Sequence, residues 1–112
     1  MEISKEVFEE IIYQKLNCLP KEIKDKLENI CFIVEENAPS YTLLGLYHGV
    51  PYPKRGPSYS LVLPDRIILY KRNIEAGCKT EKELIKRIEK VLFHEIGHYL
   101  GLEEKQLRKL GL

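Results

Sequence analysis

Sulfur-containing residues and tryptophan are scarce in this sequence: there is no Trp, and the single Met is Met1. The three cysteines, Cys18, Cys31 and Cys78, include no Cys-x-x-Cys pair, which excludes the usual zinc knuckles and redox motifs. Reduced thiols of this kind are typical of cytosolic proteins. The first residues also lack the basic and apolar regions of a secretory signal peptide, so we expect a cytoplasmic protein.

Long apolar runs and an excess of charge of one sign are also missing. No run approaches the roughly 20 apolar residues of a membrane-spanning helix, so we expect no membrane partner. Lys and Arg total 18 and Asp and Glu total 17, for a net charge of +1, whereas nucleic-acid-binding proteins usually carry a basic face. We therefore predict no nucleic-acid partner. The 112-residue length fits a single domain over residues 1–112.

The sequence predicts three short helices besides the longest one. Apolar residues at three-to-four spacing indicate a helix that starts after Ser4 and runs to about Leu16. Pro20 suits the first turn of a second, shorter helix. A last short helix is expected over about 103–110, closed by Gly111.

Short strands and one long loop are predicted between these helices. Runs rich in β-branched and aromatic residues indicate strands at 30–34, 43–47 and 67–70. Residues 73–79 are predicted to form a connection. The Pro- and Gly-rich stretch 51–64 predicts a long loop, and such loops in compact proteins often form functional flaps.

The clearest element is a long helix that starts after Thr80. Thr80 and Glu83 fit a Thr-x-x-Glu capping box, and Gly101 is well placed to end the helix. Its apolar residues recur on one broad face with helical periodicity: Leu84, Ile85, Ile88, Val91, Leu92, Ile96 and Tyr99. This helix therefore packs one face on the core.

Three residues near the end of this helix suggest a catalytic metal site. His94 and His98 are four residues apart on one helical face, so both imidazoles can reach the same metal ion. Glu95 falls inside the apolar face, where a carboxylate is costly unless it is paired or used. In enzymes with the His-Glu-x-x-His pattern, this Glu is the general base that takes a proton from the attacking water. We therefore predict Glu95 as the catalytic residue.

A catalytic zinc site typically has three protein ligands and one open position, so a third ligand is needed. After His98 the carboxylates are Glu103 and Glu104. Gly101 lets the chain turn back toward the metal, and Glu104 stands ten residues after His94. That register matches an extended pattern, His-Glu-x-x-His-x-x-Gly-x-x-ligand. We predict Glu104 as the third ligand and keep Glu103 as the alternative.

With this pattern, the chain resembles the zincin-like metallopeptidase family of bacteria, whose members are sometimes called minimal zincins. The likeness also includes the segments 43–51, 55–56 and 59–72 and the closing KQLRKLG, and covers roughly residues 27 to 111. The family usually carries Asp at the position of Glu104 and often His at the position of Tyr99.

The resemblance implies an α+β fold of the minimal zincin type. In it a small mixed β-sheet packs on the long active-site helix, with N-terminal helices and a short C-terminal helix. It implies Zn²⁺ held by His94, His98 and an acidic residue after Gly101, with Glu95 as the base. The implied activity is zinc-dependent hydrolysis of a peptide or protein substrate.

The sequence leaves two other functions open. One is a non-catalytic interaction domain that keeps the fold and binds a metal without using it. The other is a metal-dependent endoribonuclease, similar to the bacterial rRNA-maturation family, which also has two histidines at this spacing on a helix. That family lacks the Glu after the first His and ends in a third His, so Glu95, Glu104 and the balanced charge all speak against it.

Overall fold

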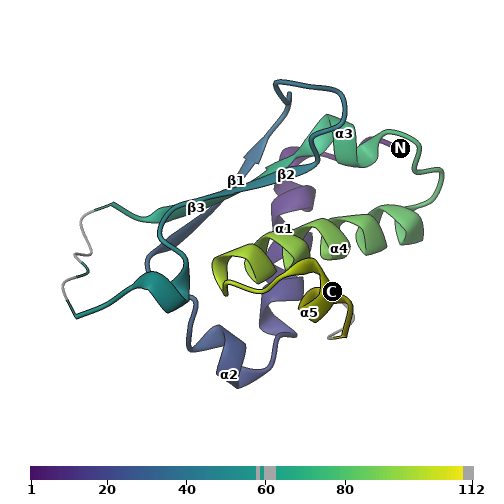
Figure 1. Cartoon of the computed structure of the whole chain (residues 1–112). Coiled ribbons are helices and arrows are strands. Elements are labelled where there is room, and N and C mark those ends of the chain that lie inside the picture. The colour runs from purple at the N-terminus through teal and green to yellow at the C-terminus, as the bar shows by residue number, and fades with distance from the viewer. Residues whose placement is uncertain (58, 60–62, 110–112) are drawn as a thin grey trace.

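The computed structural model describes residues 1–57, 59 and 63–109 of the chain. Its helices are α1 (Lys5–Asn17), α2 (Lys21–Lys24), α3 (Lys71–Glu75), α4 (Glu81–Tyr99) and α5 (Glu104–Lys109) (Figure 1). Its strands are β1 (Ile30–Glu35), β2 (Gly45–His48) and β3 (Asp65–Tyr70). Among these described residues, no helix is long and apolar enough to cross a membrane. The predicted α+β fold with a small mixed sheet and a long helix is confirmed.

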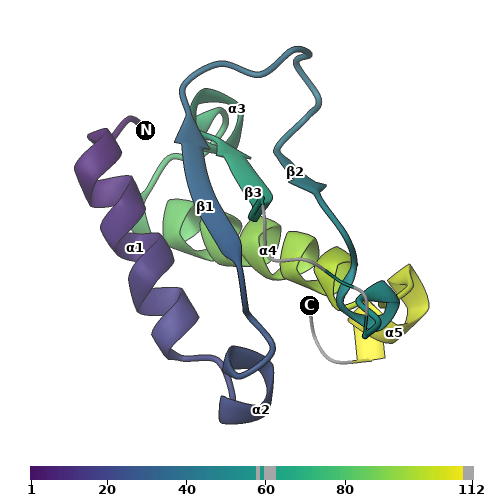
Figure 2. The same ribbon diagram turned by 90° about the vertical axis from the view of Figure 1, so that its left-hand side faces the viewer.

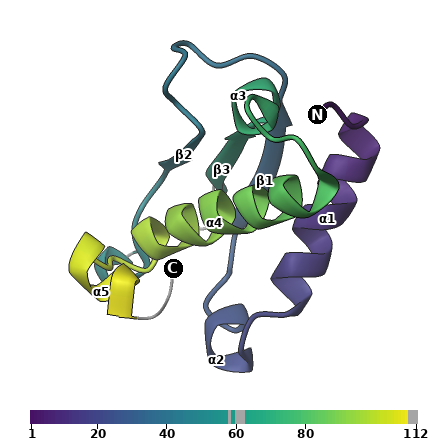
Figure 3. The same cartoon turned by 90° about the vertical axis from the view of Figure 1, so that its right-hand side faces the viewer.

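Strand β3 lies at the centre of the sheet, in the order β1-β3-β2. It pairs in parallel with β1 and antiparallel with β2, so β2 is an edge strand. Alternate side chains of a strand point to opposite faces, and Ile67 and Leu69 of β3 are fully buried on one of them. They join the same core as Ile88 and Leu92 of α4. Helices α1 and α4 pack on the sheet and on each other, as the two turned views show (Figures 2 and 3).

Two of the predicted helix starts, after Ser4 and after Thr80, are confirmed by capping hydrogen bonds. The Ser4 hydroxyl accepts from the Val7 amide at 3.2 Å, and α1 begins at Lys5. The Thr80 hydroxyl likewise accepts from the Glu83 amide at 3.2 Å, directly before α4. Each bond satisfies one of the free amides in a first helical turn.

One predicted connection is wrong, because residues 71–75 form helix α3. This single turn follows β3 without a break, and a single turn is too short to show helical periodicity in sequence. It is stabilised by tertiary contacts instead: the Lys71 ammonium lies 3.1 Å from the Glu75 carboxylate, and both are buried. Ile74 between them is fully buried in the core.

The remaining element boundaries differ from the predictions by a few residues. The predicted strand at 43–47 is observed at Gly45–His48, and the proline-rich loop contains a 3-10 turn at Tyr52–Lys54. The predicted last helix is observed as α5, to Lys109. Its predicted last residue, Leu110, and Gly111 lie outside the described residues.

Helix α4 ends where the sequence predicted, at Gly101. Gly101 adopts a left-handed backbone with φ of 76°. Its amide donates to the His98 carbonyl and the Leu102 amide donates to the Gly97 carbonyl, each at 3.0 Å. This pair of bonds is a Schellman motif, which closes a helix and reverses the chain direction. The reversal places Glu104, the first residue of α5, next to His94 of α4.

We expect Gly101→Ala to lower the free energy of unfolding by about 1–2 kcal/mol, because a Cβ is disfavoured in the left-handed region. That Cβ would also lie 2.8 Å from Cγ of Pro53. Urea denaturation followed by circular dichroism measures the loss. Gly56→Ala is the matched control, since a Cβ there meets nothing within 4 Å. Equal stability of the two variants would contradict this account of the turn.

Candidate metal site on helix α4

The last two turns of α4 bring His94 and His98 together. Their Nε2 atoms lie 3.1 Å apart, and the two rings meet edge to face with centroids 4.6 Å apart. This approach follows from the four-residue spacing, which stacks side chains on one helical face. His94 is half-buried and His98 is exposed, so the pair lies at the border between the core and solvent.

Of the two carboxylates predicted after Gly101, Glu104 is the one that the structure places beside His94. Its Oε1 atom lies 3.2 Å from Nε2 of His94. Glu103, the alternative, is exposed, and in the part of the chain that the structure describes its carboxylate forms no ion pair or hydrogen bond. The reversal at Gly101 turns the start of α5 back, and the Glu104 carboxylate is the one that reaches His94.

The two distances from His94, to His98 and to Glu104, fit a tetrahedral zinc ion, while the ligand atoms that all lie within 4.8 Å of one another are those of His94, Glu95 and His98. Zinc–ligand bonds of about 2.0–2.1 Å at tetrahedral angles separate neighbouring ligand atoms by about 3.3 Å. The distances between the two histidine nitrogens and between His94 and the Glu104 oxygen are 3.1 and 3.2 Å. Two nitrogens and one carboxylate oxygen are also a common donor set of catalytic zinc.

Glu95 lies next to the histidines but in a different environment. It is 8% exposed, in agreement with its predicted place on the apolar face. Its carboxylate and the ring nitrogens of His94 and His98 all lie within 4.8 Å of one another. Distance alone therefore allows Glu95 to act either as a metal ligand or as a base.

Burial raises the pKa of the Glu95 carboxyl above its ordinary value. The neighbouring His98 and His94 and the Tyr47 backbone amide act in the opposite direction, because they favour the ionised form. A carboxyl group with a raised pKa binds a proton more readily than an exposed one. Glu95 is thus suited to accept a proton and to release it again.

Gly45 at the start of β2 allows the edge strand to approach Glu95. A Cβ at this position would lie 2.8 Å from Cγ1 of Val91 and 3.1 Å from Cγ of Glu95. The first distance is shorter than real Cβ contacts, so a larger residue would push the strand away from α4. The absence of a side chain at Gly45 therefore holds the sheet edge directly beside the Glu95 carboxylate.

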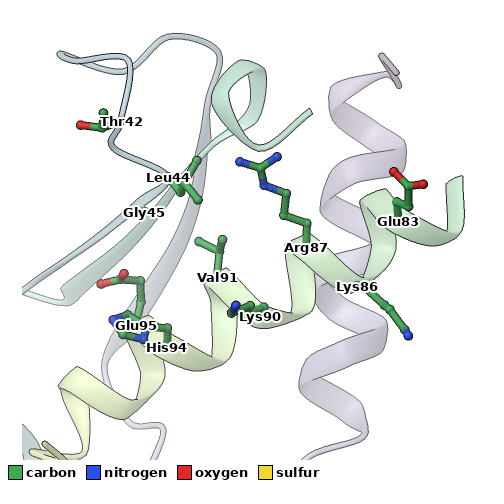
Figure 4. Close-up of a pocket in the computed structure, with 10 residues that line it drawn as sticks. All are labelled: Thr42, Leu44, Gly45, Glu83, Lys86, Arg87, Lys90, Val91, His94 and Glu95. Carbon is green, nitrogen blue, oxygen red and sulfur yellow. The ribbon is translucent and has the colours of Figure 1, made fainter. Parts of the chain in front are cut away.

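A groove of about 700 Å³ leads away from His94 and Glu95 along α4. One wall is the segment that enters β2, with Leu44 and Gly45, and the other is α4 itself. Figure 4 shows the Arg87 guanidinium extending from α4 toward Leu44. Arg87 therefore lines this groove, between α4 and the segment that enters β2.

A buried polar cluster, which the sequence did not predict, supports the loop and strand beside the site. Arg55 and Asp65 form an ion pair of 2.7 Å, with side chains 7% and 4% exposed. The Tyr47 hydroxyl donates to the same carboxylate at 2.6 Å. Burial and this carboxylate raise the pKa of Tyr47, so its phenol stays a donor and is committed to Asp65. The cluster anchors β2 and the proline-rich loop to the start of β3.

Tyr99, directly after the second histidine, is also part of this support. Its side chain is fully buried, and its hydroxyl donates to the Lys26 carbonyl at 2.5 Å. The Arg55 guanidinium lies 4.9 Å from the centre of its ring. Tyr99 therefore ties the end of α4 to the connection before β1, and its ring points into the core and not toward the metal site.

Comparison with known proteins gives one family. A family model described as zincin-like metallopeptidase matches residues 24–112. The match includes all three strands, the site helix α4 and the residues His94, Glu95, His98 and Glu104. Among curated proteins, no match was found.

Proposed function

We propose, because this chain belongs to the zincin-like metallopeptidase family, that it is a zinc-dependent peptidase. In this proposal His94, His98 and Glu104 hold the zinc and Glu95 is the general base. The observation that carries it is the spacing of the ligand atoms, 3.1 Å between the histidine nitrogens and 3.2 Å from His94 to Glu104. Three such ligands leave one position open, which is the arrangement of catalytic zinc.

Glu95 fits the role of base better than that of ligand. Glu104 already supplies a third ligand atom at a suitable distance from His94. Glu95 is buried between α4 and the edge strand and lines the groove, as His94 also does (Figure 4). A carboxylate in that position faces a bound substrate, where a proton has to be moved.

Zinc bound by these ligands would polarise the scissile carbonyl and lower the pKa of water to about 7. Glu95 takes a proton from the attacking water as the new carbon–oxygen bond forms. It then gives this proton to the leaving nitrogen as the carbon–nitrogen bond breaks. The products are a carboxyl group and an amine, and Glu95 returns to its ionised form.

The edge strand β2 suggests how a peptide would be held. In the described part of the sheet β2 pairs with β3 on one side, so its other side can pair with an extended chain. Because Gly45 brings β2 against Glu95, a peptide paired there would pass close to the base. This geometry favours a peptide substrate over RNA, and Glu95 and Glu104 also speak against an endoribonuclease.

The proposed ligand set predicts how one substitution changes zinc binding. We expect Glu104→Ala to weaken zinc binding more than about 100-fold, because mutating a residue that only hydrogen-bonds to a ligand already lowers metal affinity about 10–100-fold. Cleavage of a mixed peptide library should fall with it, and a chelator should abolish cleavage by the unaltered protein. Competition with a zinc-sensitive dye measures the affinity, and mass spectrometry measures the cleavage.

Glu103→Ala is the matched control, because it removes an equally exposed carboxylate one position earlier. We expect its zinc affinity and cleavage rate to stay within about twofold of the unaltered protein, as for surface changes generally. Equal zinc affinity of the unaltered protein and Glu104→Ala would refute the ligand set. Stoichiometric zinc without cleavage of any peptide would favour the non-catalytic alternative.

A further inference from the structure

The groove beyond the metal site carries positive charge without a carboxylate partner. Its lining includes Lys86, whose side chain extends away from Leu44 (Figure 4), and the two cations Arg87 and Lys90. Within residues 1–57, 59 and 63–109, no carboxylate lies within ion-pair distance of either side chain. Glu83 also lines the groove, but its carboxylate accepts a hydrogen bond from the Lys79 amide at the start of α4, 3.1 Å away. A ligand that lies between Leu44 and α4 therefore meets these two cations, and the carboxylates of the lining are Glu83 and Glu95.

Arg87 is held in place before any ligand arrives. Its Nη1 atom donates to the Ala76 carbonyl at 2.7 Å, and its head group extends toward Leu44 (Figure 4). One such bond leaves most of the five guanidinium N–H donors available. Because the side chain is already ordered, binding a carboxylate costs less conformational entropy than it would for a free arginine.

The apolar part of the groove lining strengthens an ion pair between a bound ligand and these cations. Leu44 and Val91 contribute apolar side chains to the lining, next to the aliphatic part of Lys90. Apolar side chains beside a cation reduce its contact with water, so an ion pair formed there is stronger than one on an open surface. A small acidic side chain that lies against this apolar lining can reach both cations.

The positions of the cations relate them to the bond that is cut. Along α4, with a rise of 1.5 Å per residue, Lys90 lies about 6 Å and Arg87 about 10 Å before His94. An extended peptide advances about 3.3 Å per residue. Lys90 and Arg87 therefore lie beside substrate side chains about two and three residues from the scissile bond.

We infer that this groove selects peptides with Asp or Glu two or three residues from the scissile bond, bound by Arg87 and Lys90. The inference rests on the proposed function, because it names the substrate class of the same site. A single-stranded RNA would offer negative charge too. The edge of β2 that pairs with no described strand, and its close approach to Glu95, favour an extended peptide.

The test measures binding, so that it does not depend on turnover. The full chain with Glu95→Gln is kept in zinc-containing, low-salt buffer with a fluorescent octapeptide that carries Glu two and three residues from its central bond on both sides. The comparison peptide carries Gln at those positions. We expect the Glu peptide to bind about tenfold more tightly, with the preference declining as salt is added. Adding Arg87→Gln should reduce the preference to about twofold, and Lys90→Gln is a second variant with the same expected direction.

Lys82→Gln is the matched control, because it removes the same charge from an exposed position of α4 outside the groove lining. Equal binding of both peptides, or an equal loss in this control, overturns the inference. So does tighter binding of an RNA hexamer than of the Glu peptide. Cleavage of both peptides at one rate by the unaltered protein refutes the selectivity and leaves the peptidase. A binding preference without any cleavage supports the selectivity and refutes the peptidase.

Discussion

Replacing Glu95 with Gln should lower the rate of peptide-bond hydrolysis by about 10²–10⁴-fold, which is the usual contribution of a positioned general base. Gln keeps the size and the hydrogen-bonding oxygen of the buried side chain but cannot take a proton from water. Zinc affinity should stay the same, because the proposed site uses Glu95 as a base and not as a ligand. Parallel assays of cleavage and of zinc binding measure the two effects separately.

Glu89→Gln is the matched control for this experiment. Glu89 lies on the same helix, and its carboxylate forms a surface ion pair of 2.8 Å with Lys15, which contributes little to stability. Its cleavage rate should match that of the unaltered protein. A large loss of zinc affinity in Glu95→Gln would instead make Glu95 a ligand. Undiminished hydrolysis or biological activity with zinc intact would refute its role as base.

A second large effect, on the stability of the fold, is expected at Asp65, outside the proposed metal site. Asp65→Ala should lower the free energy of unfolding by about 3–5 kcal/mol, because it leaves the Arg55 guanidinium buried without its carboxylate. The two side chains are 7% and 4% exposed, so water cannot replace the lost partner. The Tyr47 hydroxyl loses its acceptor as well. Urea denaturation measures the change.

The double variant Arg55→Met with Asp65→Ala shows whether the loss of stability comes from an unpaired buried charge. Removing both charges leaves no unpaired buried ion, so we expect it to be more stable than Asp65→Ala alone. A loss below about 1 kcal/mol in the single variant, as for an exposed ion pair, would show that the cluster does not support the loop as described.

The parts of the fold that the sequence predicts well are local. Helix α4 carries its apolar periodicity over 19 residues and has a cap at each end. The proposed ligands and base all lie within residues 94–104, so helix geometry and one glycine turn suffice to bring them together. The family match confirms the resemblance that these residues suggested. The assignment of ligands and base, the single domain, the cytoplasmic location and the absence of a nucleic-acid partner stay predictions.

The parts that the sequence did not predict depend on contacts between distant segments. Arg55 comes from a proline-rich loop and Tyr47 from an edge strand, and both reach Asp65 only when β2 and β3 pair. Helix α3 forms because its residues are buried, not because of a repeating pattern. The same holds for the bond of the Tyr99 hydroxyl to the Lys26 carbonyl: helical periodicity predicts the buried ring, but the partner lies 73 residues away in the chain.

The close approach of β2 to α4 at Gly45 also limits how this protein can diverge. A Cβ there would be 2.8 Å from Val91 and 3.3 Å from the Ile68 carbonyl oxygen. A smaller residue at position 91 could relieve the first contact, so substitutions at 45 and 91 should be coupled among descendants of this chain. The carbonyl belongs to the backbone and cannot be exchanged by mutation. Selection on the distance between the sheet edge and Glu95 therefore acts through a residue that has no side chain.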